Sequence, residues 1–281
     1  MSPVVCLNHQ WIPQDQASIS VMDRGFLFGD GVYEVVSVFD RSPFLMREHF
    51  DRLQCSLNGI RINNPLTVDE WSAITIDMIN RNNITNGYVY LQITRGSPEQ
   101  RSHRCPKDTP PNWLVMSQNI AHHKEYVRAH LVPDQRWAQC SIKATSLLAN
   151  VLATMSAHDC DADEAILFNN DAVTEGASSN VFIIENNKVI TTPLSDNILP
   201  GIIRQYVITA MQSLMIPFQE ARISIDRLKH ADICFITSST RLIKCISHLD
   251  QQPMNTEHPI LTQLFRAIQH DISTIAITDP A

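Results

Sequence analysis

The stretch Val173-Thr174-Glu175-Gly176-Ala177-Ser178-Ser179-Asn180-Val181-Phe182 organises the second half of the chain. It joins two apolar segments, residues 165–168 and 181–184, which are typical of buried strands. Between them lie one carboxylate, Glu175, a glycine and small polar residues, which together predict a loop. Such a loop can direct a carboxylate into a pocket without filling it, although an ordinary turn has the same composition. The rest of the chain favours the pocket.

The composition is that of a globular protein. The 281 residues are enough for one large domain or two of ordinary size, with 44% hydrophobic and 18% charged residues. The net charge of −7 is not gathered into blocks, so we expect no binding to nucleic acid or membranes. Residues 1–10 lack a secretory-signal pattern, and no apolar stretch is long enough to span a bilayer. Seven widely spaced cysteines without a CxxC pair predict reduced thiols, a cytoplasmic protein and no metal site.

The first half of the chain predicts mixed helices and strands. Three glycines within residues 25–31 require a tight turn or a close backbone approach. The alternating pattern that follows predicts a strand with Tyr33 and Val35 on one face. Periodicity then predicts two helices, the second with a capping box at Thr67 and Glu70, and one strand, over residues 47–60, 68–82 and 88–95.

A polar loop at residues 96–104 carries Arg101 and His103. Two positions apart in an extended segment, these side chains face the same way and can both donate to one carboxylate. By itself the pattern also fits a solvated loop tip. We predict a smaller N-terminal α/β domain, a polar linker and a larger C-terminal α/β domain, over residues 1–118, 119–125 and 126–281.

The second half supplies one unusual lysine and two candidate anion sites. Lys143 lies where a predicted strand passes into a predicted helix, among apolar and small residues, so we expect burial and a lowered pKa. Free N–H groups at a helix start, at Ile202 and Ile203, and hydroxyls at Ser238 and Ser239 can bind an anion. Further patterns predict strands over 127–132 and 233–236, a hairpin over 181–192, and helices over 199–215, 225–230 and 259–272.

One ligand accounts for the lysine, the carboxylate and the anion sites together. A phosphorylated pyridine aldehyde forms a Schiff base with an amine, and lysine is the side chain that offers one. The amine must be uncharged to attack, although its unperturbed pKa is about 10.4. Glu175 would hold a proton on the ring nitrogen, and Arg52, off the apolar stripe of its helix, could bind the phosphate. The sequence therefore predicts pyridoxal 5'-phosphate as cofactor.

Five motifs also occur in the order found in one known family. They are Arg24-Gly-x-x-Phe-Gly-Asp-Gly-Val-Tyr-Glu-Val-Val, His49-Phe-Asp-Arg-Leu, the Ile142-Lys143 junction, Glu175-Gly-Ala-Ser-Ser-Asn and Gly201-Ile-Ile-Arg. Over residues 23–239 the chain resembles the fold type IV pyridoxal-phosphate enzymes, which include branched-chain aminotransferases, aminodeoxychorismate lyases and D-amino acid aminotransferases. The resemblance implies an α+β, two-domain architecture.

Among these subfamilies the chain most resembles the D-amino acid aminotransferases, because its loop carries Arg101-Ser102-His103. In that subfamily an Arg-x-His pair reaches in from the partner subunit of a homodimer and binds the substrate carboxylate with a strand tyrosine, here Tyr33. The resemblance implies Lys143 as the Schiff-base lysine and Glu175 as the partner of the ring nitrogen. It also implies Val35 beside the substrate, and Arg52, Ile202, Ile203, Ser238 and Ser239 at the phosphate.

The implied reaction is transamination between a D-amino acid, of D-alanine or D-glutamate type, and a 2-oxo acid. Alternatives on the same fold are an L-branched-chain aminotransferase, an aminodeoxychorismate lyase, and a pyridoxal-phosphate-binding protein without turnover. The chain departs from the family after Thr240, where Arg241-Leu242-Ile243-Lys244 replaces an acidic residue and a Thr-Pro pair. We therefore expect a different arrangement beside the phosphate.

Overall fold

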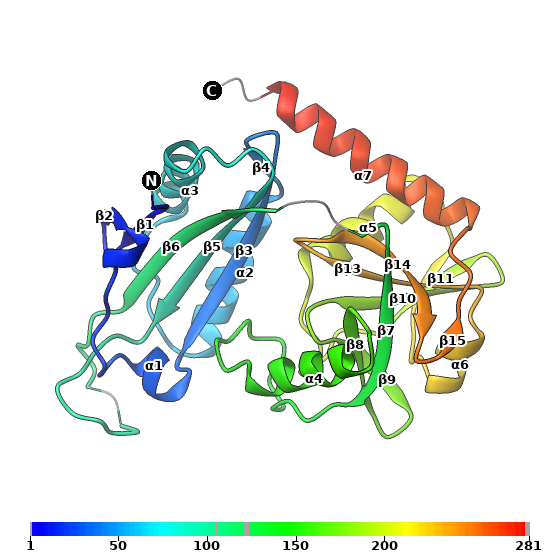
Figure 1. The fold of residues 1–281 in the computed structure, drawn as a ribbon, viewed down its shortest axis with the longest axis horizontal. Helices are drawn as coiled ribbons and strands as arrows, with labels where there is room; N and C mark the ends of the chain where they lie inside the picture. The colour runs from blue at the N-terminus through cyan, green and yellow to red at the C-terminus, as the bar shows by residue number, and fades with distance from the viewer. Residues whose placement is uncertain (1, 105, 121–123, 279–281) are drawn as a thin grey trace. The chain divides into compact units, whose positions relative to one another are not determined.

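In the computed structural model, which describes residues 2–104, 106–120 and 124–278, the chain forms two units, each built on one β-sheet (Figure 1). The first unit takes the described residues of 1–121, 142–147 and 274–281, and the second takes those of 122–141 and 148–273. The segment 142–147, with Lys143, thus groups with the first unit, although it lies inside the C-terminal domain that the sequence predicts. The predicted domain boundaries stay a prediction.

The first unit contains a six-stranded antiparallel sheet in the order β2-β1-β6-β5-β3-β4. Its strands are β1 (Val4–Leu7), β2 (Gln10–Pro13), β3 (Gly31–Phe39), β4 (Ser42–Pro43), β5 (Gly87–Thr94) and β6 (Asn112–Asn119). Side chains alternate along β3, so that Tyr33 and Val35 share the half-buried face and Glu34 points to the buried one. The predicted strand and its two-residue alternation are confirmed.

Two helices cover the buried face of this sheet, α2 (Met46–Gly59) and α3 (Val68–Arg81). Leu53 and Leu57 of α2 are fully buried, and each contributes about 1.5–3 kcal/mol through the hydrophobic effect. The capping box of α3 is present, because Thr67 and Glu70 bond each other's backbone N–H. Both predicted helices are confirmed. A short helix, α1 (Arg24–Phe28), precedes β3.

The second unit contains a nine-stranded mixed sheet in the order β12-β11-β10-β13-β14-β7-β8-β9, with β15 paired to β14. The central strands β10 and β13 are buried on both faces, and Phe182 stacks on Phe235 with ring centres 4.9 Å apart. The strands are β7 (Tyr126–Pro133), β8 (Glu164–Asn169), β9 (Ala172–Gly176), β10 (Asn180–Glu185), β11 (Lys188–Thr191), β12 (Phe218–Glu220), β13 (Ile233–Ser238), β14 (Leu242–Leu249) and β15 (Gln252–Pro253).

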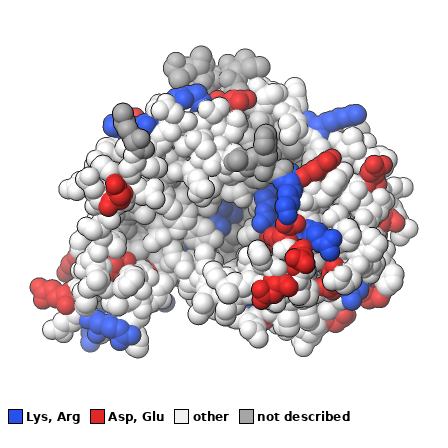
Figure 2. Space-filling view, in the orientation of Figure 1, with Lys and Arg blue, Asp and Glu red and all other residues white. Residues whose placement is uncertain are grey.

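The helices of the second unit lie close to their predicted positions. They are α4 (Leu148–Asp159), α5 (Ile202–Ser213), α6 (Ile225–His230) and α7 (Pro259–Thr278). The last continues beyond the predicted end at residue 272, and from residue 274 on it groups with the first unit. In the helix after Lys143, however, the apolar residues that indicate it are exposed and do not form a buried face: Leu148, Val151, Leu152 and Met155. No helix in the described part of the chain is both long and apolar enough to cross a membrane. On the face drawn in Figure 2, acidic and basic side chains are intermixed rather than gathered into one broad patch of either sign.

Two local predictions are wrong. Glu175 does not lie in a loop, because residues 172–176 form β9, which pairs with β8 through a bulge between Ile166 and Phe168. Only residues 177–179 form the turn before β10. Lys143 does not follow a strand, because residues 134–141 have irregular backbone whose polar side chains bond within the second unit.

Candidate active site

Lys143 is fixed through its own peptide group to β3 and α2. Its carbonyl oxygen accepts from the N–H of Tyr33 at 3.0 Å, and its N–H donates to Ser56 Oγ at 3.1 Å. Next to it, Ala144 forms a bridge to Val32. The segment 142–147 therefore covers the start of β3, which positions the lysine even though it lies in no helix or strand.

Two glycines, at the end of α1 and the start of β3, allow the backbone segments around Lys143 to lie close together. Gly29 ends α1 with φ of +65°, and a Cβ there would lie 3.2 Å from the Cα of Ser146. At Gly31 a Cβ would lie 2.6 Å from the carbonyl oxygen of Ile93. Both positions exclude side chains, the first also because L-residues rarely adopt that backbone conformation. The predicted close approach at these glycines is confirmed.

The Lys143 side chain is half-buried, whereas the sequence predicts that it is buried. Its Nζ lies 4.2 Å from the ring centre of Tyr33, a cation–π arrangement. Within the part of the chain that the structure describes, this Nζ has no ion pair with a carboxylate. Tyr33 in turn stacks on Tyr90 with ring centres 5.6 Å apart, and Val35 pairs with Tyr90 across the two strands. Tyr33 and Tyr90 thus form an aromatic wall, and burial raises the pKa of Tyr90.

Arg52 lies in a buried ionic cluster directly behind this wall. Its Nε and Nη2 donate to the two oxygens of Glu34 at 2.7 and 2.8 Å, and His49 Nδ1 lies 2.7 Å from Glu34 Oε2. Burial would raise the pKa of Glu34, but the charge and hydrogen bonds of Arg52 hold it well below its usual range. Burial lowers the pKa of His49, and its Nδ1 donates to the carboxylate, which can only accept.

The loop that carries Arg101 and His103 is attached to α1. Arg24 Nη1 donates to the carbonyl oxygen of Ser102 at 2.5 Å, and its Nη2 donates to that of His103 at 3.2 Å. The guanidinium of Arg101 lies 4.8 Å from the ring centre of Phe28, and the His103 ring centre lies 5.4 Å from the same ring. The two side chains therefore lie beside the same ring, and the described residues of this loop are held by Arg24.

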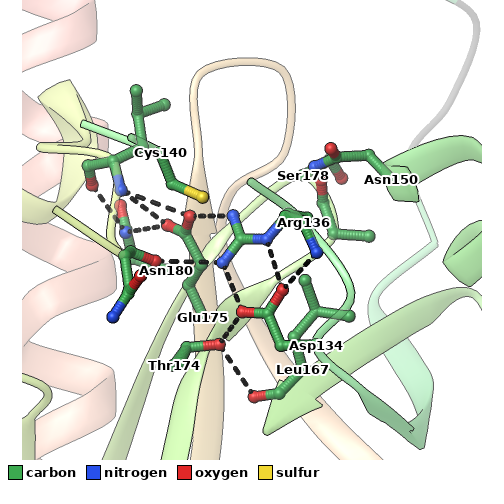
Figure 3. Close-up of polar contacts among 12 residues, drawn as sticks. Asp134, Arg136, Cys140, Asn150, Leu167, Thr174, Glu175, Ser178 and Asn180 are labelled. Atoms are coloured by element: carbon green, nitrogen blue, oxygen red, sulfur yellow. Dashed lines mark hydrogen bonds and ion pairs between the residues drawn. The ribbon is translucent and has the colours of Figure 1, made fainter. Parts of the chain in front are cut away.

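Glu175 belongs to a second buried cluster, shown in Figure 3. Its Oε2 accepts from the amide of Asn180 at 2.9 Å, and both of its oxygens accept from the N–H of Leu199, at 3.1 and 3.2 Å. Arg136 Nη1 donates to Oε1, and the same guanidinium pairs with Asp134 at 2.8 Å. The carboxylate is thus oriented from three directions.

The predicted phosphate residues of the second unit lie at a helix start and a strand end. Ile202 and Ile203 form the first turn of α5, whose N-cap, Gly201, provides no side-chain hydrogen bond. The first N–H groups of a helix have no partner within it, so this end can bind an anion. Ser238 ends β13, and Ser239 begins the turn that follows.

Two further observations fit a phosphate there. A Cβ on Gly201 would lie 1.9 Å from Asn180 Oδ1, so only glycine lets the helix start approach β10 this closely. Thr237, opposite Asn180 in the sheet, has a buried hydroxyl without a hydrogen-bond partner among the described residues. A buried unpartnered hydroxyl costs about 1–3 kcal/mol, which an accepting oxygen would remove. Within the second unit, these residues and Glu175 have the donors and the carboxylate that pyridoxal phosphate needs, and in the first unit Lys143 has the amine.

The unusual Arg241 has a structural partner. Its Nη1 donates to Glu164 Oε2 at 2.6 Å. The buried Glu164 also accepts from the N–H of Ser178 at 2.8 Å and from Ser179 Oγ at 3.1 Å. Glu164 thereby ties the turn after β9 to the turn after β13. In this chain, Arg241 in the turn after β13 therefore forms an ion pair with Glu164 at the start of β8.

Sequence reasoning missed the partners of the charged residues. Glu34, Asp134, Arg136 and Glu164 are buried, yet no local pattern distinguishes them from surface charges. One signal was available for Glu34, because strand alternation places it on the buried face of β3, where a carboxylate requires a partner.

Residues 31–249 match the amino-transferase class IV family, and the chain belongs to that family. Its members depend on pyridoxal phosphate, so this protein is a pyridoxal-phosphate-dependent aminotransferase.

Its relatives include D-alanine aminotransferases. The chain is 37% identical over 278 residues to the one from Listeria monocytogenes serotype 1/2a (strain 10403S), with 96% of each chain covered. It is 34% identical over 285 residues to the one from Staphylococcus aureus (strain N315), covering 97% of this chain and 99% of that one. Its fold is similar to that of the branched-chain aminotransferase of Thermoproteus uzoniensis, with a TM-score of 0.89, 24% identity, and coverage of 97% of this chain and 96% of that one. The predicted fold type IV architecture is confirmed.

Proposed function

We propose that the protein transfers the amino group of a D-amino acid, of D-alanine or D-glutamate type, to a 2-oxo acid. The observation that carries this proposal is the 37% identity, over 96% of the chain, to a D-alanine aminotransferase. The Arg101-Ser102-His103 loop supports it, because a guanidinium and an imidazole two residues apart can together bind a carboxylate. The reaction alternates between two half-reactions, the first consuming the amino acid and the second the oxo acid.

Lys143 is the proposed catalytic residue, and it binds the aldehyde of the cofactor. Pyridoxal phosphate supplies an electron sink for the bond that is broken at the substrate's α-carbon. Once the substrate amine has displaced it from the aldehyde carbon, Lys143 Nζ would take the proton from the α-carbon and deliver it to that cofactor carbon on the same side. Its backbone bonds to Tyr33 and Ser56 fix the origin of the side chain, so the proton always passes on one face.

The phosphate and the ring have separate proposed partners. Arg52 supplies a cation, and its bonds to Glu34 fix the guanidinium in advance. Glu175 accepts a hydrogen bond from the ring nitrogen. The remaining phosphate donors that we propose are the N–H groups of Ile202 and Ile203 and the hydroxyls of Ser238 and Ser239.

The proposed substrate site combines Tyr33 and Val35 with Arg101 and His103 of the second subunit of a homodimer. Two features together decide which enantiomer presents its α-proton to the amine. They are the position of the residues that bind the substrate carboxylate and the face of the cofactor ring on which Lys143 lies. We further propose that this dimer works in the cytoplasm, since the cysteines in the described part of the chain are free thiols.

The absorbance of the purified holoenzyme on adding D-alanine or L-alanine tests the proposal. We expect D-alanine to convert the visible band, and D-alanine with 2-oxoglutarate to yield pyruvate and D-glutamate. The K143A variant should show neither the change in the visible band nor the formation of pyruvate and D-glutamate. Conversion by L-branched-chain amino acids alone would refute the D-selective function, as would release of p-aminobenzoate from aminodeoxychorismate without an oxo acid. A band that no amino acid converts would refute turnover altogether.

Mixed dimers test the proposed role of the second subunit. If Arg101 acts across subunits, a dimer of one K143A chain and one R101M chain contains one site with both residues intact. We therefore expect mixing of the two inactive variants to restore about half of the activity per mixed dimer. No restoration would place Arg101 and Lys143 of the same chain in one site and refute the exchange.

A further inference from the structure

Arg136 lies between two carboxylates inside the second unit, as Figure 3 shows. Its Nε and Nη2 donate to the two oxygens of Asp134 at 3.0 and 2.8 Å, and its Nη1 donates to Glu175 Oε1. A further bond from Nη2 reaches the carbonyl oxygen of Asn197 at 3.0 Å. The side chains of all three charged residues are at most 8% exposed. The guanidinium therefore has one orientation, which the surrounding acceptors determine.

Glu175 accepts from one charged donor, Arg136, and from neutral donors. The neutral donors include the amide of Asn180 and the N–H of Leu199. Donors and a neighbouring cation stabilise the ionised form of a carboxylate and weaken it as a base. Removing the guanidinium would leave the neutral donors in place and take away only the cation. Glu175 would then compete more strongly for any proton close to it.

Asp134 keeps Arg136 charged and in place. Burial would raise the pKa of Asp134, but the hydrogen bonds and charge of Arg136 hold it below its usual range. Burial would lower the pKa of Arg136, yet its bonds to Asp134 and the charge of Glu175 raise it. Thr174 fixes Asp134 in turn, with a hydroxyl bond of 2.7 Å. Two carboxylates and one guanidinium give these three side chains a formal charge of −1.

We propose that Arg136 is a positioning residue that sets the protonation of the cofactor's ring nitrogen through Glu175. This inference rests on the proposed function. With Arg136 present, Glu175 accepts the hydrogen bond from the ring N–H but does not take the proton, so the ring stays cationic. Without the guanidinium, the N–H bond breaks and an O–H bond forms on Glu175. The neutral ring that results withdraws electrons less strongly from the substrate.

The nitrogen-15 chemical shift of labelled pyridoxal phosphate bound to the protein reports this proton without any turnover. We expect wild type and R136K, which keeps the charge, to hold a protonated ring nitrogen at neutral pH. In R136M Glu175 becomes the stronger base, so we expect the nitrogen-15 resonance at neutral pH to shift toward that of a neutral pyridine nitrogen. Arg222→Met is the matched control, because Arg222 is 66% exposed and its ion pair with Asp171 is long, at 3.9 Å.

An unchanged ring-nitrogen shift in R136M would overturn the inference. Equal changes in R136M and R136K would also overturn it, because that result assigns the effect to geometry and not to charge. If R136M does not fold, the double variant D134N/R136M replaces it, since it keeps the formal charge of the cluster at −1. Loss of D-alanine turnover in wild type refutes the proposed function alone, whereas a wild type that binds no pyridoxal phosphate overturns both.

Discussion

Glu34→Gln removes one charge from the most deeply buried ionic cluster of the first unit and changes almost nothing in volume. The carboxylate is 0% exposed and accepts two bonds from Arg52 and one from His49. After the change, one carbonyl oxygen and one NH2 group face a guanidinium that needs two acceptors. Arg52 is itself only 8% exposed, so water cannot replace the missing acceptor.

Breaking a buried ion pair on one side costs about 3–5 kcal/mol, because the remaining charge stays buried without its partner. For a domain of this size we expect a loss of roughly 10 °C in melting temperature. The folded-state pKa of Glu34 lies below its unfolded value of about 4.3, so its contribution is present above that pH and lost as the pH falls below it. The difference between E34Q and wild type should therefore shrink in acid.

Urea unfolding of the cofactor-free protein at pH 7 and near pH 3 measures both effects. The double variant E34Q/R52M also removes the guanidinium that faced the carboxylate, so we expect it to regain much of the stability at pH 7. It should nevertheless bind pyridoxal phosphate weakly, because the proposed phosphate cation is gone. A loss below 1 kcal/mol in E34Q, or a loss that grows in acid, would refute the account of this cluster.

Three further predictions concern neighbouring features. Burial lowers the folded-state pKa of His49, so wild type should lose stability as the pH falls below about 6.5, and H49Q should lose less over the same range in urea titrations. G201A should weaken pyridoxal-phosphate binding about tenfold or more in fluorescence titrations, because the new Cβ would lie 1.9 Å from Asn180 Oδ1. R24M should raise KM for D-alanine about tenfold with a smaller change in kcat. The reason is that the bonds of Arg24 to the carbonyl oxygens of Ser102 and His103 hold the loop that carries the proposed substrate residues.

Each of these has a control in the chain. Parallel pH profiles of wild type and H49Q would contradict the first prediction. Gln205→Ala, at an exposed position of α5, should leave cofactor affinity unchanged, and an equal effect of both α5 variants would contradict the second. Arg47→Met removes an arginine that is 73% exposed, so it should leave KM unchanged. A KM in R24M equal to that of Arg47→Met would contradict the third.

Periodicity in the sequence predicts most of the framework. The helices α2, α3 and α6 and the hairpin of β10 and β11 lie where apolar spacing and turn residues indicate them, because each depends on residues close in sequence. The Asn186-Asn187 turn has two positive φ angles, as its composition suggests. The loop assigned to Glu175 is wrong because β9 is held by a bulged pairing that no composition reveals.

The electrostatic part of the site could not be predicted in the same way. Glu34 and Arg52 are 18 residues apart, Arg136 and Glu175 are 39 apart, and Glu164 and Arg241 are 77 apart. A charged side chain looks the same in sequence whether it meets water or a distant partner. Only the folded sheet decides whether that side chain is solvated or paired. The sequence therefore predicts the residues that would bind the cofactor, but not the charged residues that orient them.

The segment 142–147 has a consequence for how the protein is made. It belongs to the first unit, but residues 122–141, which belong to the second, are synthesised before it. Until the ribosome has passed residue 147, the N–H of Tyr33 and the carbonyl oxygen of Gly31 lack the partners they have in the finished protein. A nascent chain therefore carries an uncovered strand edge until Lys143, the proposed catalytic residue, has been synthesised.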